Sequence, residues 1–175
     1  MRATGVPLVG RDEELDLLRR RLQEVASGRS GASVVLVEGS AGIGKTRLVT
    51  EALAGPGTAA LEVRWGGAEE LARARPFWPV AEALGCRPAA EDPQLRAVGE
   101  LLLAEVSDRA SPLERIAVPE QRFAALEALL GVIEELAARA PLALVLDDLQ
   151  WADPSTLLAL RVIGRRLRSL PIAVL

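Results

Sequence analysis

Eight residues in the first third of the chain, Gly39 to Thr46, have the types and spacing needed to bind a chain of phosphates. They read Gly-Ser-Ala-Gly-Ile-Gly-Lys-Thr, which fits the pattern G-x-x-x-x-G-K-T. Glycines let backbone N–H groups turn towards phosphate oxygens without a Cβ atom in the way. In this pattern the lysine reaches the β- and γ-phosphates, and the threonine hydroxyl binds Mg²⁺. The residues predicted to contact the nucleotide are Gly39, Ser40, Ala41, Gly42, Ile43, Gly44, Lys45, Thr46 and the following Arg47.

Lys45 is distinctive because it is the only lysine in a chain whose other basic side chains are all arginine. A compact ammonium on a flexible stem suits a point contact with phosphate better than a planar guanidinium does. The alternative is a glycine-rich turn that merely caps a helix. We favour the phosphate loop because an apolar segment precedes it and a helical segment follows it.

Two adjacent carboxylates, Asp147 and Asp148, end a continuous apolar run further along the chain. We predict that Asp147 serves the Mg²⁺ that Thr46 also touches, directly or through water. We predict that Asp148 orients or deprotonates an attacking water. The alternative is that one of the pair caps the turn that follows. Asp153 precedes a proline at a helix start, so we interpret it as an N-cap and not as a catalytic residue.

The elements that would position these residues alternate between strands and helices. We expect strands at 33–38, 59–64, 142–146 and 171–175, with a loop or short helix from Trp65 to Arg75. We expect helices at 11–27, 47–53, 93–106, 119–140 and from 154 onward. This alternation predicts an α/β fold with a parallel sheet, in which ligands bind beyond the carboxyl ends of the strands. At 175 residues the chain is expected to form a single domain, residues 1–175.

The composition excludes several kinds of site. The chain has no histidine and one cysteine, Cys86, which rules out a histidine-dependent nucleophile, a zinc site rich in cysteine and an internal disulfide. A formal net charge of -3 gives no general attraction to nucleic acid, and we interpret the arginines at 161, 165, 166 and 168 as a solvated helix face. No apolar run is long enough to cross a membrane, and the N-terminus lacks a signal peptide. We expect a cytoplasmic protein.

Three segments together carry a resemblance to a known family. They are Leu-Val-Gly-Arg-Asp at 8–12, the phosphate loop with Arg-Leu-Val at 39–49, and Leu-Val-Leu-Asp-Asp-Leu-Gln-Trp-Ala-Asp at 144–153. In this order they resemble the ATPase domain of large bacterial LuxR-type transcriptional regulators. That family is an AAA-like, signal-transduction branch of the P-loop ATPases, similar to the domains of origin-recognition complexes. The resemblance covers nearly the whole chain.

The resemblance implies a three-layer αβα P-loop NTPase with ATP and Mg²⁺ as cofactors. Val9, Gly10 and Arg11 would lie near the adenine and ribose, Asp147 would serve the metal, and Asp148 would act on water. Lys45 would have a catalytic role with Asp148. The strand begun at Pro171 would lie between the phosphate-loop strand and the Asp147 strand. The partners that the resemblance implies are ATP and ADP and the downstream domains of a larger regulator. A second copy of the chain is a further implied partner, in a nucleotide-dependent manner.

The family pattern continues past residue 175 to a sensor arginine, a further strand, a helical lid and a DNA-binding domain. We therefore expect a chain truncated at its C-terminus, with an uncovered edge beside the phosphate-loop strand. The leading hypothesis is an ATP-binding and ATP-hydrolysing switch module. A nucleotide-binding scaffold with little or no turnover and a small-molecule P-loop kinase are the alternatives. We expect no membrane contact and no direct contact with nucleic acid from this segment.

Overall fold

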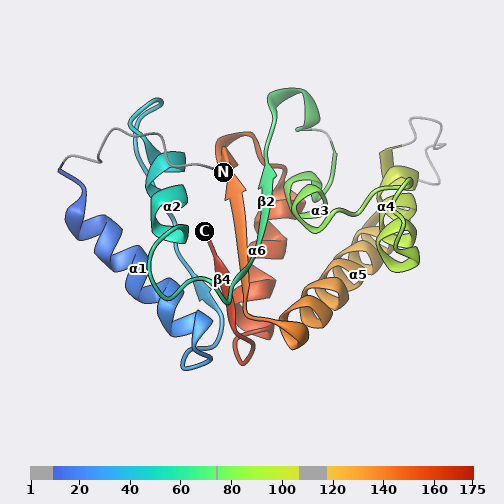
Figure 1. Cartoon of the computed structure of the whole chain (residues 1–175). Helices are drawn as coiled ribbons and strands as arrows, with labels where there is room; N and C mark the ends of the chain where they lie inside the picture. The colour runs from blue at the N-terminus through green and yellow to red at the C-terminus, as the bar shows by residue number, and fades with distance from the viewer. Residues whose placement is uncertain (1–9, 74, 107–117) are drawn as a thin grey trace.

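The structure is a computed structural model that describes residues 10–73, 75–106 and 118–175. In these parts of the chain, four strands form one parallel sheet, as the sequence predicted (Figure 1). The strands are β1 (Ser33–Val34), β2 (Glu62–Gly67), β3 (Leu142–Asp147) and β4 (Ile172–Val174). The helices are α1 (Asp12–Ala26), α2 (Lys45–Leu53), α3 (Trp78–Leu84), α4 (Pro93–Val106), α5 (Val118–Arg139) and α6 (Pro154–Arg166), with short 3₁₀ turns η1 (Glu70–Ala72) and η3 (Leu149–Trp151).

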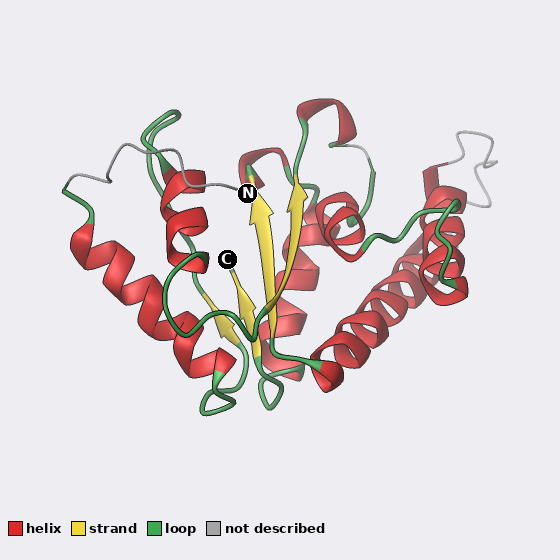
Figure 2. Cartoon of the chain, viewed as in Figure 1, coloured by secondary structure: helices red, strands yellow, loops and turns green. Residues whose placement is uncertain are grey.

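The strand order is β1-β4-β3-β2, so the last strand in the sequence is a central one. Ala173 of β4 pairs with Ser33 on one side and Ala143 on the other. This position of β4, between the phosphate-loop strand and the Asp147 strand, confirms the prediction. Because all pairs are parallel, the carboxyl ends of the strands point to the same edge of the sheet (Figure 2). The residues that follow β1 and β3 therefore meet at that edge.

Helices cover both faces of the sheet, which gives three layers (Figure 1). Ala143 and Val145 of β3 belong to the core shared with α1 and α2. Leu142, Leu144 and Leu146 belong to the larger core shared with α3, α5 and α6. A strand buried on both faces needs apolar residues at successive positions, which explains the unbroken apolar run at 142–146. α4 packs on α5 at the outside of the second layer.

Two strands differ from the sequence prediction. β1 covers two residues where six were expected, and it is not buried: Val34 is 51% exposed and the following Leu36 is 65% exposed. Among the described residues β1 pairs with β4 alone, so this apolar run lies at an edge of the sheet, which agrees with the uncovered edge expected beside the phosphate-loop strand. β2 begins three residues later than predicted and includes Trp65, which was expected in a loop or short helix. Its register with β3, Glu62 to Leu142 through Gly67 to Asp147, sets these bounds.

The predicted N-cap at Asp153 is confirmed, and Asp92 caps the helix that was predicted to start at residue 93. Asp153 accepts hydrogen bonds from the N–H groups of Ser155 (2.8 Å) and Thr156 (3.1 Å) at the start of α6. Asp92 does the same at the start of α4, from Gln94 (2.8 Å) and Leu95 (3.3 Å). None of the helices in the described ranges is long and apolar enough to span a lipid bilayer. We also expected a loop from Ser107 to Val118; residues 107–117 of it lie outside the described residues, and Val118 is the first residue of α5.

Candidate functional site

The glycine loop between β1 and α2 has a backbone that only glycine adopts readily. Gly42 and Gly44 have positive φ angles of 75° and 97°. Helix α2 begins directly after Gly44, and no side chain caps its first turn. The first N–H groups of a helix have no partner inside the helix, so this turn offers free donors and the positive end of the helix dipole. These two features together favour an anion at the loop.

The ammonium of Lys45 lies over the loop from which it projects. Its Nζ donates hydrogen bonds to the backbone carbonyls of Gly39 (3.0 Å) and Ser40 (3.2 Å). Both acceptors are neutral, and both contacts are solvent-exposed. A charged phosphate oxygen is a stronger acceptor for an ammonium than a carbonyl, so an anion in the loop would draw Lys45 away from these carbonyls.

A hydrogen bond joins the loop to the tip of β3. The hydroxyl of Thr46 donates to Oδ2 of Asp147 at 2.7 Å, although the two residues are 101 positions apart. The other oxygen of Asp147, Oδ1, accepts the backbone N–H of Asp148 at 2.9 Å. The structure therefore brings together the two residues that the sequence assigned to Mg²⁺. Hydroxyl and carboxylate oxygens are the donors that Mg²⁺ prefers, with phosphates and waters completing its six ligands.

Among the described residues there is no group of three or more histidine, cysteine, aspartate or glutamate side chains that could hold a metal unaided. This fits Mg²⁺ bound together with phosphates, because such an ion takes one or two protein ligands and keeps its remaining positions for substrate and water. Thr46 and Asp147 supply that number of ligands. The site chemistry is therefore compatible with Mg²⁺ carried by a nucleotide.

Asp148 has a left-handed backbone conformation, with φ at 56°, which is uncommon for a residue other than glycine. Its Oδ1 accepts a hydrogen bond from the side-chain amide of Gln150 at 2.8 Å. Asp148 makes no side-chain cap to the 3₁₀ turn η3 that follows it. The alternative of a turn cap therefore does not explain this carboxylate, and its role towards water stays a prediction.

These residues line a cavity of about 800 Å³ at the carboxyl edge of the sheet. This volume lies in the range of roughly 300 to 1,000 Å³ typical of small-molecule sites. The phosphate-loop residues Gly39, Ala41, Gly42, Gly44, Lys45, Thr46 and Arg47 line it, together with Asp147 and Asp148. Ser40 and Ile43 are not among the lining residues, although the Ser40 carbonyl holds Lys45.

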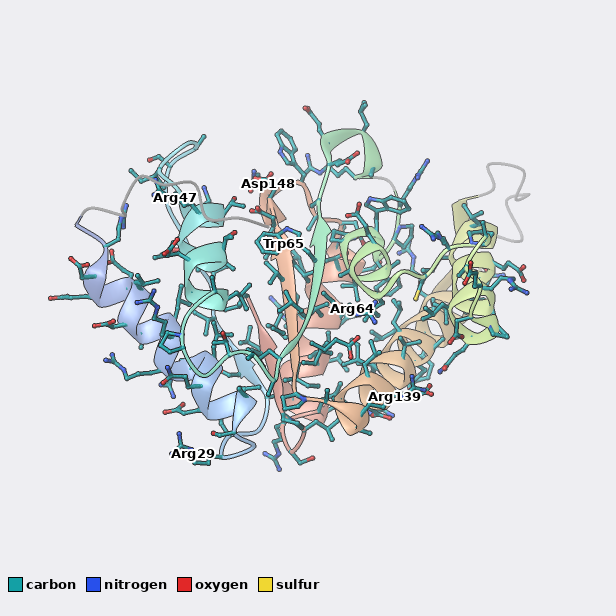
Figure 3. All side chains as sticks on the ribbon, in the orientation of Figure 1. Arg29, Arg47, Arg64, Trp65, Arg139 and Asp148 are labelled. Carbon is teal, nitrogen blue, oxygen red and sulfur yellow. The ribbon has the colours of Figure 1, made fainter. Side chains whose placement is uncertain are left out.

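Figure 3 shows how the cavity draws on three separate segments. Arg47 from α2, Trp65 from β2 and Asp148 from the end of β3 lie towards one end of the strands, whereas Arg29 and Arg139 lie towards the other. The expected adenine and ribose contacts of Val9, Gly10 and Arg11 stay predictions. Val9 lies outside the described residues, Gly10 and Arg11 are not among the residues that line the cavity, and Arg11 forms an ion pair with Glu14.

Sequence reasoning did not assign several of the lining residues to the site, and three of these have polar or aromatic side chains: Trp65, Gln150 and Glu38. Trp65 was missed because β2 was placed three residues too early. Once its register with β3 is known, Trp65 pairs with Val145, two residues before Asp147. Glu38 directly precedes the phosphate loop and Gln150 lies within the segment 144–153, so their proximity in sequence to the predicted residues was the available signal.

Comparison with known proteins places this geometry in a family. The model of the AAA ATPase domain matches residues 7–175. This chain belongs to the AAA ATPase domain family. Nucleotide binding is the activity that this AAA ATPase domain suggests.

The AAA ATPase domain described here also resembles one longer protein. It is 28% identical over 173 residues to a protein of Rhizobium meliloti (strain 1021) described as uncharacterized protein R02095. The aligned region is 87% of this chain and 16% of that relative, so the chain spans a small part of the relative's length. No solved structure matches the chain.

Proposed function

We propose that this AAA ATPase domain binds ATP with Mg²⁺ in the cavity beyond the carboxyl ends of the strands and hydrolyses it. The observation that carries the proposal is the 2.7 Å hydrogen bond between Thr46 and Asp147. It joins the glycine loop to the carboxylate at the tip of β3. The groups that would bind phosphate and the groups that would bind the metal therefore line the same cavity. ATP is proposed over GTP because the chain's single lysine stands at position 45, so the N-K-x-D guanine signature is absent.

Each residue has a distinct role in the proposal. The ammonium of Lys45 would bind the terminal phosphates, and the N–H groups of the loop and of the first turn of α2 would bind the oxygens around them. Thr46 and Asp147 would hold Mg²⁺, which when bound neutralises developing charge on the phosphates. Asp148 would accept a proton from the attacking water.

The wider role that we propose is a regulatory switch in a larger bacterial transcriptional regulator of the LuxR type. The likeness to a much longer relative supports a domain that works alongside others, because 16% of that relative corresponds to this chain. The motif order at 8–12, 39–49 and 144–153 supports the regulator branch. In this role the nucleotide state would select between two conformations, and other domains or a second copy would deliver the output.

A second candidate is a nucleotide-binding scaffold with little or no turnover. The hydrogen bond from Gln150 to Asp148 favours it, because that bond occupies one oxygen of the proposed general base. A small-molecule kinase would differ from both in its product. Release of free phosphate would identify an ATPase, and an intact nucleotide would identify the scaffold. A phosphorylated acceptor would identify the kinase.

The test is calorimetric titration of ATP with and without Mg²⁺, together with a phosphate-release assay. Lys45→Ala removes charged hydrogen bonds worth about 1.5 to 3 kcal/mol, so its affinity should fall about 10- to 150-fold. Mg²⁺ should raise the ATP affinity of Asp147→Asn much less than it raises that of the wild type. Without Mg²⁺ the two proteins should bind ATP with the same affinity. Arg161→Ala, an exposed site on α6 away from the cavity, is the control. Unchanged Mg²⁺-ATP affinity in both cavity variants would refute the site.

A further inference from the structure

A second cavity of about 230 Å³ lies between α3 and α4 and shares no lining residue with the nucleotide cavity. Its walls are almost entirely apolar and include Trp78, Ala81, Cys86, Leu102 and Leu103. Burial and the nearby charge of Asp92 raise the pKa of the Cys86 thiol to about 11, so this wall carries a neutral group. The volume is below the roughly 300 Å³ at which sites for drug-sized ligands begin, so it suits a single small ring system.

The mouth of the cavity is positively charged. The guanidinium carbon of Arg75 lies 4.9 Å from the centre of the Trp78 ring, and Arg87 lines the same cavity. None of the described lining residues is acidic. Asp92 is the nearby carboxylate, and its Oδ1 accepts two N–H groups at the start of α4. An apolar interior lined by two arginines matches an aromatic ring that carries an anionic group.

Helix α3, which forms one side of this cavity, is also hydrogen-bonded to the nucleotide site. The N–H of Phe77, the residue before Trp78, donates to Oδ2 of Asp153 at 3.1 Å. Asp153 lies five residues after Asp148, beyond η3. From the other end of α3, Oε2 of Glu82 accepts the N–H of Gly67 at 2.7 Å.

Gly67 in turn pairs with Asp147 at the edge of the sheet. Both arms of the nucleotide cavity, β2 and the segment after β3, are therefore tied to α3. A shift of α3 by a ligand would reach Asp147 through the Glu82–Gly67 hydrogen bond and the pairing of β2 with β3, and it would reach Asp148 along the chain from Asp153.

We propose that the cavity between α3 and α4 is an effector site for a small aromatic carboxylate, and that its occupancy changes nucleotide affinity through α3. The ring lies against Trp78, Ala81 and Leu102, and the carboxylate faces Arg75 and Arg87. The effect on nucleotide affinity rests on the proposed function, whereas the binding site itself does not.

Binding is tested first without nucleotide, by calorimetric titration of 2-naphthoate into the chain, with neutral 2-naphthamide as the matched control ligand. We expect saturable 1:1 binding of the naphthoate and weaker binding of the amide. Arg75→Gln or Arg87→Gln should each weaken naphthoate binding about two- to fivefold, because both side chains are exposed. Leu103→Trp fills the cavity and should abolish binding.

Arg161→Gln on α6 is the control variant and should bind as the wild type does. The site is refuted if 2-naphthoate does not saturate the wild type, or if naphthoate and amide bind equally. It is also refuted if Leu103→Trp binds 2-naphthoate with unchanged affinity.

The link to the nucleotide is tested by titrating Mg²⁺-ATP with and without saturating 2-naphthoate. A change in ATP affinity is expected, and ATP must change naphthoate affinity by the same factor, because coupling between two sites is reciprocal. Equal ATP affinities overturn the effector role and leave the binding site intact. Absence of ATP binding in a chain that still binds 2-naphthoate overturns the proposed function and, with it, the coupling.

Discussion

Replacing Asp153 with alanine should destabilise the chain more than any other loss of a helix cap described above. The carboxylate is 5% exposed and accepts four hydrogen bonds. Three of them come from the N–H and hydroxyl of Thr156 and the N–H of Ser155, at the start of α6. The fourth comes from the N–H of Phe77, before α3. Asp153→Ala therefore removes a cap and a connection between two helices.

The expected loss follows from these contacts. Removal of an aspartate N-cap costs about 0.5 to 2 kcal/mol. A buried N–H group left without an acceptor, here that of Phe77, costs about 1 to 3 kcal/mol. We expect a fall of about 3 kcal/mol in the free energy of unfolding. For a chain of this length each kcal/mol corresponds to roughly 2 to 4 °C, so Tm should fall by about 6 to 12 °C.

The measurement is urea denaturation followed by circular dichroism, with Asp92→Ala as the matched control. Asp92 also caps a helix with two N–H contacts, but these are exposed and involve no second element, so about 1 kcal/mol is expected. Asp153→Ser should fall between the two, because serine caps α6 and is too short to hold Phe77. Equal losses in Asp153→Ala and Asp92→Ala would refute the reasoning, since they would mean that the bond to Phe77 contributes nothing.

Three further predictions concern the two cavities. Asp148→Asn should bind Mg²⁺-ATP with an affinity within about twofold of the wild type. It should release phosphate at least about 100-fold more slowly, as expected for loss of a general base. An unchanged rate of phosphate release would show that Asp148 takes no part in the chemistry. ATP should change the tryptophan fluorescence through Trp65, which lines the nucleotide cavity, so Trp65→Phe should lose most of the change and Trp78→Phe should keep it. Alkylation of Cys86 by iodoacetamide should accelerate about tenfold per pH unit up to a pKa of about 11, and a plateau near pH 9 would contradict this. The same raised pKa means that the unfolded chain loses the thiol proton first, so its contribution to stability is complete below about pH 9 and is lost as pH rises towards 11.

The sequence was most informative where burial is complete. The run 142–146 is apolar at every position because both faces of β3 are covered, and such a run has few alternatives to a central parallel strand. Asp153 before Pro154 was equally clear, because a capping carboxylate followed by proline at the first helical position is a local signal. The pairing of Thr46 with Asp147 followed from the motifs and the parallel topology.

The sequence was least informative where the extent of an element depends on the other elements that pair or pack with it. The segment at 33–38 contains an apolar run at 34–37, yet it forms only the two-residue β1, because the pairing available to an edge strand is not encoded in its own residues. The bounds of β2 depend on its register with β3, which also placed Trp65 in the cavity. The cavity between α3 and α4 depends on how closely the two helices pack. The spacing of apolar residues in each helix does not predict whether a cavity is left between them.

The central place of β4 has a consequence for how the chain is made. Ser33 and Val34 obtain their described strand partners only at Ala173 and Val174, about 140 residues later, and closing so long a loop carries a large entropy cost. During synthesis, β2 and β3 can pair with each other before β4 has left the ribosome, whereas β1 and the glycine loop after it cannot join the sheet. The segment that would bind phosphate is therefore the last part of the sheet to assemble, and nucleotide added during refolding should act on a late step and leave the early pairing of β2 with β3 unchanged.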